Sequence, residues 1–231
     1  MNGTAMITEI FASIQGEGFY AGHRHIFIRF KGCNLKCSFC DTRSRIMAER
    51  ISVSEVLKRA SGLMLTNSKN TVALTGGEPL LQDVFLKELL PRLASKGVVI
   101  YLETNGTLTQ ALECIISYID IIAMDIKLPS VCGISPCWRA HKIFLNRARD
   151  KEFFIKVVVS DAIDMQEFDK ALALVKETGC DVPIIIQPET RHGSLGINVS
   201  ADTLFRLQER ALGCFSKVLV MPQSHKMMGL K

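Results

Sequence analysis

The sequence predicts an α/β fold, a partial (open) TIM-like barrel of about six parallel βα units with N-terminal and C-terminal extensions. Short β-branched runs alternate with longer amphipathic stretches along most of the 231 residues, as expected for successive βα units. Several of the runs are apolar throughout, which is typical of strands covered on both faces. A complete eight-fold barrel needs about 250 residues, so we expect one domain over residues 1–231 whose barrel stays open.

Strands are predicted where apolar and β-branched residues run together for five to seven positions. These segments are His25–Phe30, Thr71–Thr75, Val98–Glu103, Ile121–Lys127, Phe153–Val159, Val182–Gln187 and Lys217–Met221. Helices are predicted where apolar residues recur every three or four positions. These segments are Val53–Leu65, Leu80–Ser95, Leu108–Ser117, Met165–Thr178 and Ala201–Leu212.

The helix boundaries carry local signals. Ser52 precedes the first helix and Glu55 follows three residues later, which is the spacing of a capping box. Gly179 and Gly213 follow the last two helices and are expected to end them.

Polar, glycine-rich segments follow the predicted strands. They read KGCNLKC, GGEP, TNGT, LPS, QPET and PQSHK. In parallel α/β folds the loops at the carboxyl ends of the strands converge on the active site. We therefore expect these segments to meet around one pocket.

Composition excludes some classes of function. The net charge is +5, but no run of Lys and Arg is dense enough to indicate nucleic acid. No apolar stretch approaches the roughly 20 residues of a membrane span, and the first residues do not resemble a secretory signal. We expect a cytoplasmic protein with reduced thiols.

Three of the eight cysteines lie close together, in GCNLKCSFCDT. Cys33, Cys37 and Cys40 have the spacing C-x3-C-x2-C. A zinc site would need a fourth ligand, such as Asp41, His23, His25 or a distant cysteine. An iron–sulfur cluster with one open iron would need only these three. Cys132 and Cys137 form a second pair without nearby partners, which we interpret as structural.

The cysteine spacing, with an aromatic residue before the last cysteine, resembles the signature of radical S-adenosylmethionine enzymes. The resemblance extends to LTGGEP, residues 74–79. It implies a [4Fe-4S] cluster on Cys33, Cys37 and Cys40, with the fourth iron held by S-adenosylmethionine. The glycines of GGEP would let the backbone approach the amino group of that cofactor.

Further motifs narrow the resemblance. SIQGEG, CDT, LETNGT, MDIKLP, IKVVVS, IIIQP and MPQSHK follow one another along the chain, and together they resemble the 7-carboxy-7-deazaguanine synthases of queuosine and deazapurine biosynthesis. Membership would imply ring contraction of 6-carboxy-5,6,7,8-tetrahydropterin with loss of ammonia. The 5′-deoxyadenosyl radical would take a hydrogen from C6 and later return it. Mg²⁺ would also be needed, with Thr42 as a ligand.

The same resemblance assigns roles to individual residues. Those implied for the cofactor are Phe39, Asp41, Gly76, Gly77, Glu78, Asp125, Ile126, Lys127, Gln187, Pro188 and Glu189. Those implied for the pterin are Ile14, Gln15, Gly16, Glu17, Arg29, Thr75 and His225. A carboxylate such as Glu17 can pair with an amino-pyrimidinone edge, and Arg29 could clamp the substrate carboxylate. The segment around His225 would close over the pterin.

The family also implies partners, namely a flavodoxin-like reductant and a second copy of the chain in a homodimer. Neither nucleic acid nor a membrane is expected as a direct partner. Two alternatives remain open at this point. One is a glycyl-radical enzyme activase, which shares the cysteine spacing and acts on a protein. The other is a zinc-stabilised binding protein without catalytic activity.

Overall fold

A nine-stranded sheet forms the centre of the computed structural model, which describes residues 3–40, 47–191 and 196–230. The strand order is β3-β1-β2-β4-β5-β6-β7-β8-β9. The strands are β1 (Thr4–Ile14), β2 (Arg24–Phe30), β3 (Glu49–Ser52), β4 (Thr71–Gly76), β5 (Val99–Thr104), β6 (Ile121–Asp125), β7 (Glu152–Val159), β8 (Ile184–Pro188) and β9 (Val218–Val220).

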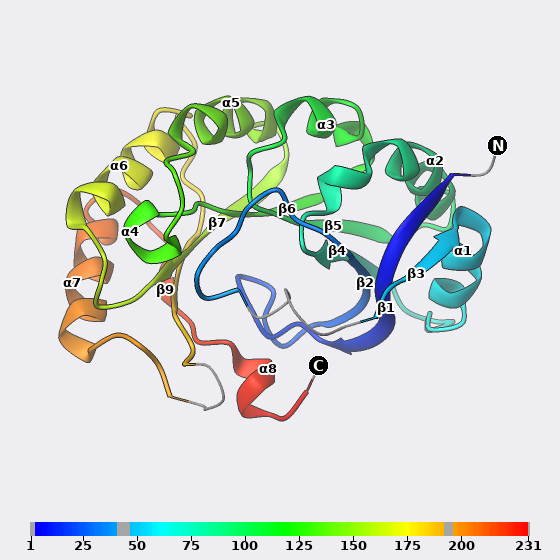
Figure 1. The fold of residues 1–231 in the computed structure, drawn as a ribbon, viewed down its shortest axis with the longest axis horizontal. Helices are drawn as coiled ribbons and strands as arrows, with labels where there is room; N and C mark the ends of the chain where they lie inside the picture. The colour runs from blue at the N-terminus through cyan, green and yellow to red at the C-terminus, as the bar shows by residue number, and fades with distance from the viewer. Residues whose placement is uncertain (1–2, 41–46, 192–195, 231) are drawn as a thin grey trace.

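All neighbouring strands from β2 to β9 pair in parallel, which gives six successive crossovers. At one edge β1 runs antiparallel to both β2 and β3. The sheet curves into an incomplete barrel, with most of the helices along its outer arc (Figure 1). This confirms the prediction of an open barrel with about six parallel βα units.

The helices of the barrel follow the strands in chain order (Figure 1). They are α1 (Val53–Ser61), α2 (Asp83–Ala94), α3 (Thr109–Glu113), α4 (Pro129–Cys132), α5 (Trp138–Ala148), α6 (Met165–Lys176), α7 (Ala201–Leu212) and α8 (Ser224–Met227), with short 3₁₀ turns η1 (Pro79–Gln82) and η2 (Ile116–Tyr118). The Ser52 side chain caps α1 by accepting a hydrogen bond from the Glu55 backbone N–H, as predicted. Among the described residues no helix is both long enough and apolar enough to cross a bilayer.

The main hydrophobic core lies between the outer face of the sheet and the helices. On β2, for example, Ile26 and Ile28 point to this core, whereas Phe27 between them belongs to a second, smaller cluster inside the barrel. This alternation follows from the two-residue repeat of a strand. The barrel interior is therefore a separate environment from the helix-covered core.

Some elements differ from the sequence-based expectations. The predicted helix Leu108–Ser117 is divided into α3 and η2. Ile115, which lies between them, is fully buried in the core. Ile115 and Ile116 are both β-branched, and such residues have a low helix propensity. We did not predict α5, whose buried face includes the polar His141 beside Phe144 and Leu145. Strands β1 and β3 were also missed.

Candidate functional site

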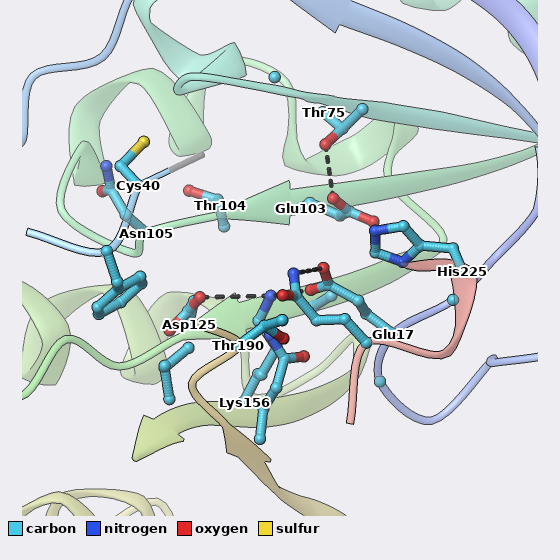
Figure 2. A pocket seen from close by; sticks show the side chains of 18 of the residues that line it. Glu17, Cys40, Thr75, Glu103, Thr104, Asn105, Asp125, Lys156, Thr190 and His225 are labelled. Carbon is cyan, nitrogen blue, oxygen red and sulfur yellow. Dashed lines mark hydrogen bonds and ion pairs between the residues drawn. The ribbon is translucent and has the colours of Figure 1, made fainter. Parts of the chain in front are cut away.

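A cavity of about 900 Å³ opens at the carboxyl ends of the parallel strands. Five of the six polar loop segments named above contribute residues to its lining, and Leu128–Ser130 does not. Figure 2 shows Cys40 and Asn105 toward one end of the pocket and Glu17 and His225 toward the other. The loops therefore converge as the sequence predicted.

Two layers of side chains fill the barrel below and around this cavity, because inward-pointing residues recur at every second position. The lower layer is apolar and consists of Phe27, Ala73, Tyr101, Ile121, Ala123, Phe154 and Ile185. Two positions further along each strand lies a polar layer, which we define as Arg29, Thr75, Glu103, Asp125, Lys156 and Gln187. The polar layer borders the cavity, so a ligand there would meet charged groups above an apolar floor.

Lys156 is the centre of an ion-pair chain in the polar layer. Its Nζ lies 2.6 Å from Glu17 Oε2 and 3.4 Å from Asp125 Oδ2, and Asp125 Oδ2 is also 2.7 Å from Lys127 Nζ. Figure 2 shows Glu17 and Lys156 pointing toward each other. Positive and negative groups thus alternate across the pocket.

The charges in this chain shift the pKa values of its members. Burial alone would raise the pKa of Glu17, but the charge and hydrogen bond of Lys156, with a hydrogen bond from Gln223, lower it to about 2. Burial alone would lower the pKa of Lys156, but Glu17, Asp125 and Glu103 together raise it. Both groups are therefore ionised at neutral pH.

Glu103 is a second, half-buried carboxylate beside the cavity. Gln15 Nε2 donates to its Oε1 at 2.8 Å. Thr75 Oγ1 donates to its Oε2 at 2.6 Å, as Figure 2 shows. The loop before β2 is thereby tied to the polar layer.

The C-terminal helix α8 closes one side of the pocket. Gln223 Nε2 donates to Glu17 Oε1 at 2.6 Å, and the Ser224 N–H donates to the Gly16 carbonyl at 2.9 Å. A Cβ atom on Gly16 would lie 2.3 Å from His225 Nδ1, so only glycine allows this close approach.

The three cysteines of the loop after β2 all line the cavity. Cys33 is exposed, Cys40 is half-buried and Cys37 is buried. The glycines of GGEP are needed for the packing of this loop, since a Cβ on Gly77 would lie 1.8 Å from the carbonyl oxygen of Gly32. Our expectation that the missing Cβ leaves room for a cofactor therefore overlooked a protein contact.

A fourth thiol lies next to the cysteine loop. Cys132 is 1 % exposed, and a hydrogen bond with Cys37, together with burial, raises the pKa of its thiol well above the ordinary value. The Ser38 N–H also donates to the Cys132 carbonyl at 2.8 Å. Interpreting Cys132 as an ordinary buried side chain therefore missed its contact with a candidate ligand.

Most of the residues implied by the family resemblance come together in this structure. The cavity is lined by Ile14, Gln15, Gly16, Glu17, Arg29, Cys33, Cys37, Phe39, Cys40, Thr75, Gly76, Gly77, Asp125, Lys127, Gln187, Pro188, Glu189 and His225. Two others do not line it. The Glu78 side chain is fully buried and accepts hydrogen bonds from neighbouring loops, and Ile126 packs in the main core. Asp41 and Thr42 lie outside the described residues.

Comparison with known proteins identifies the family. Residues 27–131 match the model of the Radical SAM superfamily. The 7-carboxy-7-deazaguanine synthase of Geobacter sulfurreducens is 35 % identical, with 97 % of both chains covered. That of Methanopyrus kandleri is 34 % identical over 96 % of this chain and 92 % of the relative. The chain belongs to the 7-carboxy-7-deazaguanine synthase family.

The fold agrees with that assignment. The crystal structure of QueE from Escherichia coli superposes with a TM-score of 0.63 over 94 % of both chains, at 20 % identity. The radical SAM superfamily implies a [4Fe-4S] cluster and S-adenosylmethionine. A family member thus needs three thiolates and a pocket for an adenosyl group beside them.

The residues present in this synthase-family chain fit both groups. Three thiolates each bind a different iron of such a cluster, so they need not converge on a single point. The buried atoms Asp125 Oδ1 and Gln187 Oε1 border the cavity and have no hydrogen-bond partner within the described part of the chain. They offer acceptors for the hydroxyl and amino donors of an adenosyl group.

A zinc site is not formed by the residues that the structure describes. Within residues 3–40, 47–191 and 196–230, no three His, Cys, Asp or Glu side chains are grouped closely enough to hold one ion. His25, one of the candidate fourth ligands, packs its ring 5.0 Å from that of Tyr101 beneath the cavity floor. Burial lowers the pKa of His25 to about 4.

Sequence reasoning missed several polar residues of the cavity, notably Glu103, Asn105, Lys156 and Gln223. Glu103 and Lys156 each carried a signal, since a single charge inside an otherwise apolar strand must find a partner when the strand is buried. Asn105 and Gln223 lie in motifs that the family resemblance had already singled out.

Proposed function

We propose that this chain is a 7-carboxy-7-deazaguanine synthase, which contracts 6-carboxy-5,6,7,8-tetrahydropterin to 7-carboxy-7-deazaguanine and releases ammonia. The observation that carries this proposal is one cavity with three cysteines at one end and the charged Glu17, Lys156 and Glu103 at the other. Identity to synthases along almost the whole chain supports the choice of substrate.

Residues at the cysteine end would hold the cofactor. Cys33, Cys37 and Cys40 would ligate the cluster, which with S-adenosylmethionine supplies hydrogen-atom abstraction by a carbon radical. Asp125 and Gln187 would accept hydrogen bonds from the adenosyl group. Phe39, Gly76, Gly77, Lys127, Pro188 and Glu189 line the same region and would complete the pocket.

Residues at the other end would bind the pterin. The Glu17 carboxylate is kept ionised by Lys156 and would accept hydrogen bonds from the amino-pyrimidinone edge. Gln15 and Thr75 already hold Glu103 and would present it to the ring. Arg29, whose guanidinium lies 5.6 Å from the Phe11 ring, would pair with the substrate carboxylate. His225 would cover the substrate from α8.

Three further features belong to the proposal. Thr42 would be a ligand of Mg²⁺, together with water and substrate oxygens. A flavodoxin-like protein would deliver the electron, and the chain would act as a homodimer.

The test is an anaerobic assay of the cluster-reconstituted, dithionite-reduced protein with S-adenosylmethionine, Mg²⁺ and 6-carboxytetrahydropterin, followed by mass spectrometry. We expect 7-carboxy-7-deazaguanine in many-fold excess over enzyme, without matching consumption of S-adenosylmethionine. If 5′-deoxyadenosine forms but no deazapurine does, the substrate assignment is wrong and a glycyl-radical activase becomes the better hypothesis. A colourless protein with stoichiometric zinc would instead support the binding-protein alternative.

A further inference from the structure

Asn105 follows β5 and reaches the first cysteine of the loop. Its Nδ2 lies 3.7 Å from Cys33 Sγ, and the Leu35 backbone N–H lies 3.4 Å from the same sulfur. Asn105 is 7 % exposed and lines the cavity at its cysteine end (Figure 2). Two N–H groups from different parts of the chain thus point to one sulfur atom.

Hydrogen bonds on the other side of the amide fix its orientation. Asn105 Oδ1 accepts from the Thr107 N–H at 3.1 Å and from Thr107 Oγ1 at 2.5 Å. A backbone N–H can only donate, so the oxygen must face Thr107 and the NH₂ group must face the cysteine loop. There Nδ2 also donates to Asn34 Oδ1 at 2.9 Å.

Two buried side chains hold the backbone of Asn105. Its N–H donates to Glu78 Oε2 at 2.8 Å, and its carbonyl lies 3.1 Å from His141 Nε2. A carbonyl only accepts, so His141 presents the Nε2–H tautomer, and burial lowers its pKa to about 4. Both Glu78 and His141 are fully buried. They therefore hold Asn105 rigidly although neither lines the cavity.

An N–H group directed at a cluster-ligating sulfur affects the reduction potential. Reduction adds negative charge to the cluster and its thiolates, so a hydrogen-bond donor stabilises the reduced state more than the oxidised state. We propose that Asn105 is a positioning residue that holds the Cys33 sulfur through its side-chain N–H and thereby raises the reduction potential of the cluster. This inference rests on the proposed function, because it requires the cluster to be bound at Cys33.

The test is an anaerobic redox titration of the reconstituted protein, followed by electron paramagnetic resonance without S-adenosylmethionine. Asn105→Asp keeps an oxygen for Thr107 but replaces the donor with an acceptor. Asn105→Ser adds no charge, and its hydroxyl lies one bond short of the Nδ2 position, too far from Cys33 Sγ to donate to it. Loss of one hydrogen bond to a charged group changes an equilibrium constant by on the order of tenfold. For one electron, tenfold corresponds to about 59 mV. We therefore expect the reduction potential of the Asn105→Ser variant to be lower than that of the wild type by about that much, and that of Asn105→Asp to be lower still.

Asn70→Ala is the matched control. The Asn70 side chain makes three hydrogen bonds in a loop, with Leu65 and Ser68, and it lies at the opposite end of β4 from the cysteines. Its loss should leave the potential unchanged. A second pair of variants tests the hydrogen bond from His141 to the Asn105 carbonyl. His141→Phe should lower the reduction potential, whereas His141→Gln retains an N–H donor and should keep the wild-type potential.

Iron and sulfide content, with far-ultraviolet circular dichroism, would confirm loading and folding of each variant. If Asn105→Asp does not hold a cluster, Asn105→Ser decides the question. An unchanged potential in a loaded Asn105 variant would overturn the inference and leave the proposed function standing. A wild-type protein that loads its cluster but forms no deazapurine would overturn the substrate assignment without touching the inference.

Discussion

Replacement of Lys156 by methionine tests the ion-pair chain. The Lys156 ammonium lies 2.6 Å from Glu17 Oε2, and the two side chains are only 18 % and 21 % exposed. Against the effect of burial, Lys156, with smaller contributions from Gln223 and His225, lowers the pKa of Glu17 from 4.5 to about 2. At about 1.4 kcal/mol per pKa unit, this corresponds to roughly 3 kcal/mol of stability at neutral pH. We expect Lys156→Met to lower the free energy of unfolding by about that amount.

The assay is urea denaturation of the cluster-free protein at pH 7, followed by circular dichroism. Lys142→Met is the control, because Lys142 Nζ is 2.7 Å from Glu177 Oε2 but the side chains are 55 % and 51 % exposed. Such a surface pair contributes less than about 1 kcal/mol. If Lys156→Met and Lys142→Met lowered the free energy of unfolding by similar amounts, the reasoning would be refuted.

The loss of unfolding free energy caused by Lys156→Met should also depend on pH in a definite direction. In the wild-type protein the depressed pKa of Glu17 contributes stability that is fully present above pH 4.5 and is lost as the pH falls toward 2. Without Lys156, burial raises the pKa of Glu17, so the variant is relatively more stable at low pH. The difference between wild type and Lys156→Met should therefore narrow from pH 7 to pH 4.5. The double variant Lys156→Met/Glu17→Gln should be more stable at pH 7 than Lys156→Met alone.

Three further predictions concern the cysteine loop and α8. Cys40→Ala should abolish the cluster chromophore and turnover. Cys180→Ala should leave both intact, because the hydrogen bonds described for the Cys180 thiol go only to backbone carbonyls. Loss of iron in Cys180→Ala would refute the ligand assignment. Gly77→Ala places a Cβ against a backbone carbonyl and should cost about 2 kcal/mol or more in urea denaturation, while Gly62→Ala should cost under about 1 kcal/mol. Gly16→Ala should displace α8 and raise the pterin KM about tenfold without changing S-adenosylmethionine binding by calorimetry; equal losses of both would contradict a pterin-specific role.

The parallel strands could be predicted because each is an apolar run that is too short to be a buried helix. Strand β1 is different, since most of its residues after Ile7 are only half-buried and one of them, Glu9, reaches toward the site. Its sequence mixes polar and apolar residues, so it resembles a loop motif. Helix α5 was missed for a related reason, because a buried histidine interrupts its apolar face.

The sequence also predicted that the three cysteines and the family motifs would meet at one cavity, but it did not predict the partners of their side chains. The contact of Lys156 with Glu17 joins residues 139 positions apart, and that of Gln223 with Glu17 joins residues 206 apart. Such contacts depend on strand register and on how the C-terminal helix docks. A charge inside an apolar strand indicates that a partner exists without identifying it.

The match to the radical SAM superfamily divides the cavity into two parts. Residues 27–131 contain the three cysteines and Asp125, which would hold the cluster and the adenosyl group, together with Glu103 of the polar layer. The proposed pterin contacts Gln15, Glu17 and His225 lie outside that range, and so does Lys156, which pairs with Glu17. Hydrogen bonds and ion pairs from Gln15 to Glu103 and from Lys156 to Asp125 connect the two parts. A change of substrate within this fold would therefore have to preserve these connections while altering the N-terminal loop and α8.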